Sequence, residues 1–253
     1  MSVTLEGGSV VAELHEGVVA EAGSLRVWSV LGRRAGANAI SLRTIEASPG
    51  LSPGLRNAEC DEVLYVVSGQ GTLVLDGAAH PIGPEMGIFV RPGVTFAISN
   101  ATDAPMVLVS SRCPDPQGAL ETFDALPAPS RDRRPPHAPI ARLVDEPRHF
   151  TAEDRWYVEL VGAKIGSAKV TQFVGSIPPG RAPMHSHAHE EVLCILSGEG
   201  RMWSGDTSTP VRQGSCIFLP REQLHCVENT GPGELRLLGV FFPARSGAER
   251  YEV

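Results

Sequence analysis

The segment Pro183 to Gly198, PMHSHAHEEVLCILSG, concentrates side chains that could bind a metal ion. Three of the chain's eight histidines alternate there, and two glutamates and an apolar run follow. Side chains at positions i and i+2 of an extended strand point to one face, so His185 and His187 project together. Glu191 begins the apolar run, and His225 lies in a later strand-like segment. Imidazoles and a carboxylate that converge from different strands are ligands for a divalent metal.

The expected metal ligands are therefore His185, His187, Glu191 and His225. Four protein ligands leave a hexacoordinate ion two open positions for a substrate or O₂, which a closed structural site would lack. One divalent transition metal is expected, and the ligand types do not choose among Fe, Mn, Ni, Cu and Zn. His189 continues the alternation outside this register, so we expect it beside the ligands or facing solvent, with ligand substitution as the alternative. The catalytic residues stay unknown.

The residues around the ligands predict an apolar pocket. Strand phase puts Leu193, Ile195 and Val227 on the face that carries Glu191 and His225. Further lining candidates, whose phase the sequence leaves open, are Gln172, Phe173 and Trp203. Residues expected to face away from the metal are Glu190, at the surface, and Cys194 and Cys226, in packing roles. Such a wall suits a small, mostly apolar organic molecule better than a sugar or oxalate.

The chain contains an internal repeat. EVLYVVSGQG (Glu62 to Gly71) and EVLCILSGEG (Glu191 to Gly200) agree at six of ten positions, at an offset of 129. The same offset carries Asn100 onto Asn229. Agreement at more than one place indicates a duplicated unit.

The first copy has lost most of the expected ligands. At the 129 offset, Arg56, Ala58, Glu62 and Phe96 stand for the four ligands of the second copy. One carboxylate cannot hold a divalent cation alone, so the N-terminal copy is predicted to be metal-free. Arg56 is expected to pair with Glu62, because a buried charge needs a partner, or alternatively to anchor an acidic small molecule.

Each copy consists of short β-rich runs separated by turn residues, which predicts a sandwich or barrel. In the second copy the runs are 157–161, 169–174, 191–196, 215–219 and 235–242. Positions 114–147 hold eight prolines and predict a connector with at most short helices, for example at 118–126. The expected organisation is an N-terminal domain at 1–113, a Pro-rich connector at 114–150 and a C-terminal domain at 151–253.

These motifs resemble the two signatures of the cupin superfamily. Gly180, His185, His187, Glu191 and Gly198 follow the first, with four residues instead of the usual five between the first glycine and histidine. The second is met by Gly214, Pro220, His225 and Asn229, with Glu222 in place of its internal glycine. The resemblance implies an all-β bicupin of two tandem double-stranded jelly-roll barrels, with the metal in the second.

The resemblance leaves three functions open. One is an oxygenase, similar to quercetinase-type dioxygenases, in which substrate and O₂ bind the metal. Another is non-redox Lewis-acid chemistry of isomerase, aminohydrolase or decarboxylase type; aminohydrolase-like bicupins have a similar length but a different ligand order. The third is a binding protein without turnover.

Composition limits the partners. A formal charge of −7 argues against nucleic acid or an anionic membrane as the main partner. The N-terminus lacks the pattern of a secretory signal, and no run approaches the roughly 18 apolar residues of a membrane span. Five cysteines without C-x-x-C spacing favour a reduced, cytoplasmic chain. We expect a small-molecule substrate and either a monomer or a homodimer.

Overall fold

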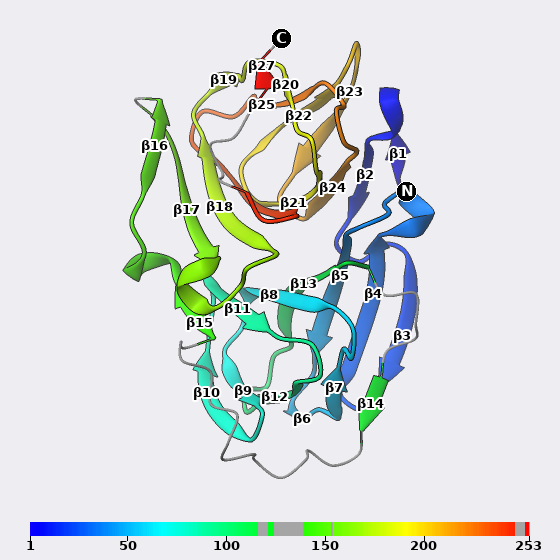
Figure 1. Ribbon diagram of the computed structural model, residues 1–253, viewed down its shortest axis with the longest axis vertical. Helices are drawn as coiled ribbons and strands as arrows, with labels where there is room; N and C mark the ends of the chain where they lie inside the picture. Colours follow the sequence, from blue (N-terminus) through cyan, green and yellow to red (C-terminus); the bar gives the residue numbers. More distant parts are fainter. Residues whose placement is uncertain (116–120, 124–138, 153, 246–250, 253) are drawn as a thin grey trace.

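The computed structural model describes residues 1–115, 121–123, 139–152, 154–245 and 251–252. It contains two stacked β-barrels, one above the other in Figure 1, with short 3₁₀ turns as its described helices. These turns are η1 (Glu6–Gly8), η2 (Arg33–Ala35), η3 (Leu143–Asp145) and η4 (Ala163–Ile165). Among the described residues, none forms a helix long and apolar enough to cross a membrane.

Two sheets form the N-terminal barrel. The larger sheet has the order β15 (Ile140–Arg142), β11 (Met86–Val90), β8 (Asp61–Ser68), β13 (Met106–Cys113), β5 (Ser41–Ala47), β4 (Leu25–Leu31), β3 (Val18–Ala22). The smaller has the order β10 (Ala78–Ile82), β9 (Gly71–Leu75), β12 (Thr95–Asn100), β7 (Gly54–Arg56), β14 (Glu121–Phe123), and β6 (Gly50–Leu51) also pairs with β12.

The C-terminal barrel repeats this plan. Its larger sheet has the order β1 (Val3–Thr4), β2 (Val10–Glu13), β24 (Ser215–Leu219), β21 (Glu190–Ser197), β26 (Leu235–Phe242), β18 (Thr171–Ile177), β17 (Arg155–Val161), β16 (His149–Ala152). Its smaller sheet has the order β23 (Thr207–Arg212), β22 (Glu199–Ser204), β25 (His225–Asn229), β20 (His185–Ser186), β27 (Tyr251–Glu252), and β19 (Gly180–Arg181) also pairs with β25. The five strand-like runs of this half each coincide with one of these strands, although β18 begins at Thr171, two residues after the start of the run expected at 169–174. The jelly-roll prediction is confirmed.

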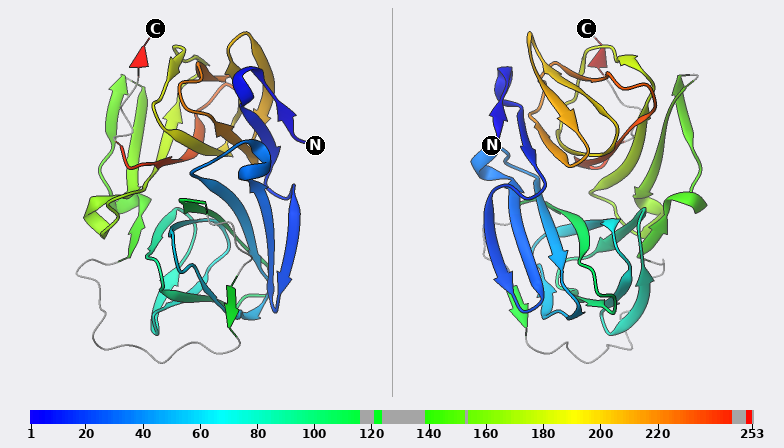
Figure 2. Two further views of the ribbon diagram at one scale, coloured as in Figure 1. Left: turned by 45° about the vertical axis from the view of Figure 1, so that its right-hand side comes forward. Right: turned by 180° about the vertical axis from the view of Figure 1, so that it is seen from behind.

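Each barrel includes a strand that lies outside the sequence range expected for its domain. β2, near the N-terminus, pairs with β24 of the C-terminal barrel, whereas β15, from the expected connector, pairs with β11 of the N-terminal barrel. The dark blue strands β1 and β2 therefore run along the upper barrel in both views of Figure 2. The three-part division at 113 and 150 stays a prediction, and positions 116–120 and 124–138 of the connector lie outside the described residues. The prediction of a short helix at 118–126 is wrong for the residues of this range that the structure describes, because Glu121–Phe123 forms strand β14.

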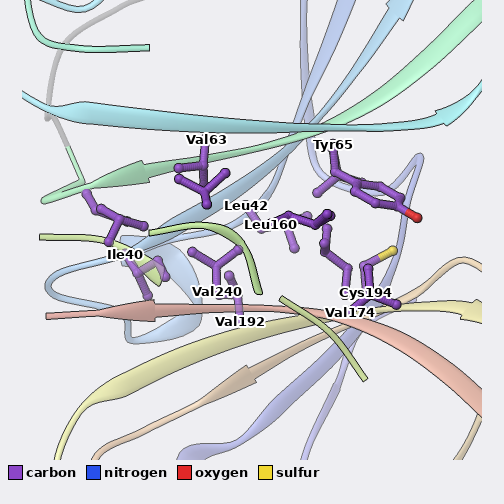
Figure 3. Packing of buried hydrophobic residues seen from close by; sticks show 14 of the residues in the cluster. Ile40, Leu42, Val63, Tyr65, Leu160, Val174, Val192, Cys194 and Val240 are labelled. Carbon is purple, nitrogen blue, oxygen red and sulfur yellow. The ribbon is translucent and has the colours of Figure 1, made fainter. Parts of the chain in front are cut away.

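Three buried layers hold the structure together. One apolar cluster fills the N-terminal barrel, a second lines the C-terminal barrel, and the third lies between the larger sheets of the two barrels. Figure 3 shows this third layer, in which Val63 of β8 and Val192 of β21 belong to one packed group. Strand β21, which carries Glu191, is thus supported on its far side by the other barrel. Because the larger sheets are apolar on both faces, their sequences read as continuous hydrophobic runs.

Candidate metal centre

Three histidines converge inside the C-terminal barrel, two from paired strands and His187 from the position just after β20. His185 of β20 stands directly opposite His225 of β25 in the antiparallel pair. The ligand nitrogens of His185, His187 and His225 all lie within 4.8 Å of one another. Two ligands on opposite sides of one transition metal are about 4.2 Å apart, since metal–imidazole bonds are about 2.1 Å long. The limit of 4.8 Å is slightly above this span, so the three rings would move slightly together to hold a single divalent cation.

Backbone carbonyls orient two of these rings. Nδ1 of His185 lies 3.1 Å from the carbonyl oxygen of Pro183, and Nδ1 of His225 lies 2.7 Å from that of Gln223. A carbonyl only accepts a hydrogen bond, so it favours the tautomer whose Nδ1 carries the proton. That tautomer leaves the Nε2 lone pair available for a metal, as in many histidine sites.

Glu191, the fourth expected ligand, approaches the three histidines from the larger sheet. Its Oε2 lies 3.4 Å from Nε2 of His187, and both side chains are buried. Burial raises the pKa of Glu191 to about 8. Burial, together with the neighbouring His185, lowers the pKa of His225 to about 3. His225 is thus neutral and ready to ligate at physiological pH, while the Glu191 carboxylate gains most from a bound cation.

The turn before His225 keeps the shape that a glycine would favour. Glu222 replaces the glycine of the motif, and it adopts a φ of 60°, in the left-handed region. Its backbone N–H donates to the carbonyl of His187, 2.6 Å away. In the first copy Gly93 has a φ of 77° and donates to the carbonyl of Asn57 in the same way. The departure from the motif therefore leaves the turn geometry intact.

The neighbours of the ligands are buried. His189 is 2% exposed and stacks on His187 with ring centroids 4.9 Å apart, so it lies beside the ligands and does not face solvent.

The surface position expected for Glu190 is wrong. Its carboxylate accepts hydrogen bonds from the backbone N–H groups of Asn38 and Ala39, at 3.0 and 2.7 Å, and ties this strand to the other half of the chain. Cys194 and Cys226 are buried free thiols, as their packing role requires.

A cavity of about 100 Å³ opens beside the histidine cluster. All four expected ligands line it, and its apolar wall consists of Phe173, Ile177, Leu193, Val227, Leu237 and Phe241. The structure thus brings Phe173, Leu193 and Val227 to the cavity, and Ile195 lies in the same apolar cluster behind them. Sequence reasoning missed the aromatic ring of Phe241, 4.9 Å from that of Phe173.

Two expected lining residues lie elsewhere. Gln172 precedes Phe173 and therefore points to the opposite face of β18, where its Oε1 approaches Gly87 of the N-terminal barrel. Trp203 faces outward from β22. Its indole N–H donates to Glu228 at 2.7 Å, and the Arg181 guanidinium lies 3.9 Å above its ring. Strand alternation explains both corrections, because the inward positions next to them belong to Phe173 and Met202.

The register of the N-terminal barrel corrects the expected correspondence. Phe96, at the position of His225, pairs with Leu55 and not with Arg56. Leu55 therefore replaces His185, and the shared turn hydrogen bond makes Asn57, not Ala58, the counterpart of His187. The reason is one extra residue in the first copy between positions 57 and 62, which a fixed offset of 129 cannot represent.

The expected pairing of Arg56 with Glu62 is also wrong. Arg56 is half-buried at the barrel surface and pairs with Glu121 of β14 at 3.2 Å. Glu62 instead accepts from Nη2 of Arg43 at 2.5 Å, from the Ser110 hydroxyl at 2.5 Å, and from the side-chain amide of Asn57. A buried guanidinium thus occupies the region in which the other barrel collects its histidines.

Sequence comparisons match this chain to one family. The family model described as a cupin domain matches twice, at residues 44–112 and 173–241, and the second match contains all four expected ligands. Auxin-binding protein 1 of Arabidopsis thaliana is 25% identical over 160 residues, which cover 58% of this chain and 78% of that protein. An oxalate-binding protein of Thermotoga maritima is 35% identical over 66 residues, 25% of this chain and 54% of that protein.

Solved structures share the two-barrel fold. Oxalate decarboxylase of Bacillus subtilis, a protein with Mn(II) centres, superposes with a TM-score of 0.76 at 14% identity, over 94% of this chain and 78% of that one. A putative glyoxylate-induced protein of Pseudomonas aeruginosa gives a TM-score of 0.75 at 19% identity, over 97% and 92% of the two chains. At such identities the likeness establishes the fold alone.

Proposed function

The chain belongs to the cupin family, and from that premise we propose that it is a mononuclear metal-dependent enzyme acting on a small, mostly apolar organic molecule. His185, His187, Glu191 and His225 would hold the metal. The bound ion would supply Lewis acidity and open positions for oxygen ligands, including O₂ if the ion is redox-active. The protein would supply a dry, shaped cavity, since Phe173 and Phe241 exclude water beside the site.

The observation that carries the proposed reaction type is the scarcity of acid–base groups in the cavity. Besides the four ligands, the described lining side chains that titrate are Arg155 and Tyr157, both half-buried. Hydrolysis and decarboxylation need a positioned proton donor or acceptor. An oxygenase that binds its substrate as an already ionised chelate has no such need. We therefore favour a dioxygenase-like activity on a molecule that binds the metal through oxygen.

The similar structures favour a second candidate, a non-redox lyase. Oxalate decarboxylase shares the fold at a TM-score of 0.76, and a curated relative is an oxalate-binding protein. Oxalate itself is a small dianion, and the apolar wall beside the histidines offers it little compensation for burial. A decarboxylase here would thus act on a less charged acid, with Tyr157, which lines the cavity, as the proton donor.

The test is an oxygen electrode. The protein, loaded separately with Fe²⁺, Cu²⁺ and Mn²⁺, would be offered a panel of catechols and enolisable diketones, with His225→Phe as the control. Metal-dependent O₂ uptake that His225→Phe abolishes is the expected result. CO₂ release without O₂ uptake from a small keto or hydroxy acid would contradict the oxygenase and support the lyase.

Partners and compartment follow from surface and thiol chemistry. The charge of −7 disfavours nucleic acid and anionic lipid as partners, which leaves the small molecule as the main one. All five cysteines are free and buried, which is compatible with a reducing compartment such as the cytoplasm. Monomer and homodimer both remain compatible with this proposal.

A further inference from the structure

The two copies of the repeat differ most at one corner of the barrel interior. Register pairs Val27 with Ile45 in the first copy and Tyr157 with Gly175 in the second. In the next inward pair of positions along β4 and β17, Leu25 of the first copy corresponds to Arg155 of the second. Leu25, Val27 and Ile45 are all buried in the filled N-terminal core. The same fold thus accepts three hydrophobic side chains where the C-terminal barrel has arginine, tyrosine and glycine.

These three replacements open the cavity. Arg155, Tyr157 and Gly175 all line it. A Cβ at Gly175 would meet Leu237 and Phe173 at 3.4 and 3.5 Å, which is ordinary contact, and its φ is not in the left-handed region. The backbone therefore does not require glycine, and the missing side chain leaves space. Tyr157 borders that space and packs against Phe173 edge to face, with centroids 6.3 Å apart.

Arg155 lies far along the sheet from the metal ligands. Strand β26 serves as the ruler for this distance. Glu191 pairs with Phe241 of β26, whereas Ile177, the neighbour of Arg155 across the sheet, pairs with Leu235 of β26. Six strand residues separate these two positions of β26, about 20 Å of backbone at 3.3 Å per residue. One cavity therefore has the predicted cation site at one end and Arg155 at the other, with an apolar wall between them.

We infer that this cavity takes a small α,ω-functional organic acid: oxygen donors bind the metal at one end, a short apolar spacer follows, and a carboxylate at the other end is recognised by Arg155. This inference rests on the proposed function for its metal end. Arginine suits the outer end because its planar fork binds carboxylates in a defined orientation. Recognition at both ends would select molecules by length, which an apolar pocket alone does poorly.

The test compares matched pairs of metal-binding probes. Linear ω-carboxyalkyl hydroxamates with two to five methylenes would be titrated into protein loaded with one equivalent of Zn²⁺, and each would be compared with the n-alkyl hydroxamate in which a methyl replaces the carboxylate. Isothermal titration calorimetry gives both dissociation constants. At the best spacer length, the carboxylate probe is expected to bind about tenfold more tightly than its methyl partner.

Variants that copy the first repeat keep this test interpretable. Arg155→Leu should abolish the tenfold ratio, leave the alkyl probe within about twofold of wild type and retain the zinc, while Arg155→Lys should restore part of the ratio. Gly175→Ile should weaken both probes at least tenfold with zinc retained, because it fills the cavity as Ile45 fills the other barrel. An unchanged ratio in Arg155→Leu would overturn this inference alone. Failure of the wild type to bind zinc or any hydroxamate would overturn the proposed function and the inference with it.

Discussion

Each barrel buries one glutamate at the same position of its larger sheet, and the two barrels neutralise it differently. Glu62 of the first barrel is 1% exposed, and Glu191 of the second is 4% exposed. Glu62 contacts the guanidinium of Arg43, which β5 contributes. The counterpart of Arg43 in register is Phe173, so Glu191 has no guanidinium at that position and its pKa rises to about 8.

The difference shows how one fold can have either a filled core or an open cavity with a candidate metal site. In the first barrel, the guanidinium of Arg43 belongs to the chain itself and neutralises the Glu62 carboxylate permanently. Phe96 and Leu55 then fill the remaining space. Three imidazoles add no charge, so the second barrel depends on a proton or a cation from outside. Gly239 lies opposite Phe173, at the position where the first barrel has Ser110. The absence of a side chain at Gly239 makes space for the phenyl ring of Phe173, since a Cβ at this position would lie 2.2 Å from that ring.

The largest effect should come from giving the second barrel the first barrel's residue. His225→Phe copies Phe96, removes one ligand and places an aromatic ring inside the cluster. Metal affinity should fall by more than about a hundredfold, because even changes to residues that support a ligand cost 10- to 100-fold. Metal content after dialysis measures the effect. His189→Ala is the control and should keep its metal; equal loss in both variants would contradict the ligand set.

The next largest effect should come from breaking the ion pair in the first barrel. Arg43→Met leaves Glu62 buried without its cation, which should lower the free energy of unfolding by about 3–5 kcal/mol. Denaturant titration measures this change. The double variant Arg43→Met, Glu62→Gln should recover much of the loss, and metal binding by the second barrel should persist. A single variant as stable as wild type would show that Arg43 does not neutralise Glu62.

A smaller, graded effect should follow pH. With a pKa of about 8, Glu191 is protonated in the metal-free protein at pH 6–7, and a metal must displace that proton. Apparent metal affinity should therefore fall about tenfold for each pH unit below 8. His225, with a pKa of about 3, adds no competing proton in this range. Competition titrations with a chelator between pH 6 and 9 measure the slope, and a flat profile would contradict the account.

Local patterns in the sequence were sufficient for the fold and for placing His185, His187, Glu191 and His225 at one cavity; that these four residues hold a metal stays a prediction. The H-x-H alternation and the position of Glu191 depend on strand geometry alone, so they could be predicted. The phase of Gln172 and Trp203 could not, because apolar and polar residues mix in their short runs. The role of Glu190 depends on Asn38, which is 152 residues away in the sequence. In the same way, β2 near the N-terminus pairs with β24 of the C-terminal barrel, a contact between segments far apart in the sequence. The single-residue shift that makes Leu55 the counterpart of His185 required the observed register.

Metal stoichiometry tests the central contrast between the barrels most directly. The protein would be purified without a histidine tag or added metal, titrated with a divalent ion, and analysed for elements per chain. One tightly bound equivalent, lost in His225→Phe and retained in Arg43→Met, is the result this account predicts. Two equivalents per chain, or one that survives His225→Phe, would contradict the division into one metal-binding barrel and one that a guanidinium neutralises.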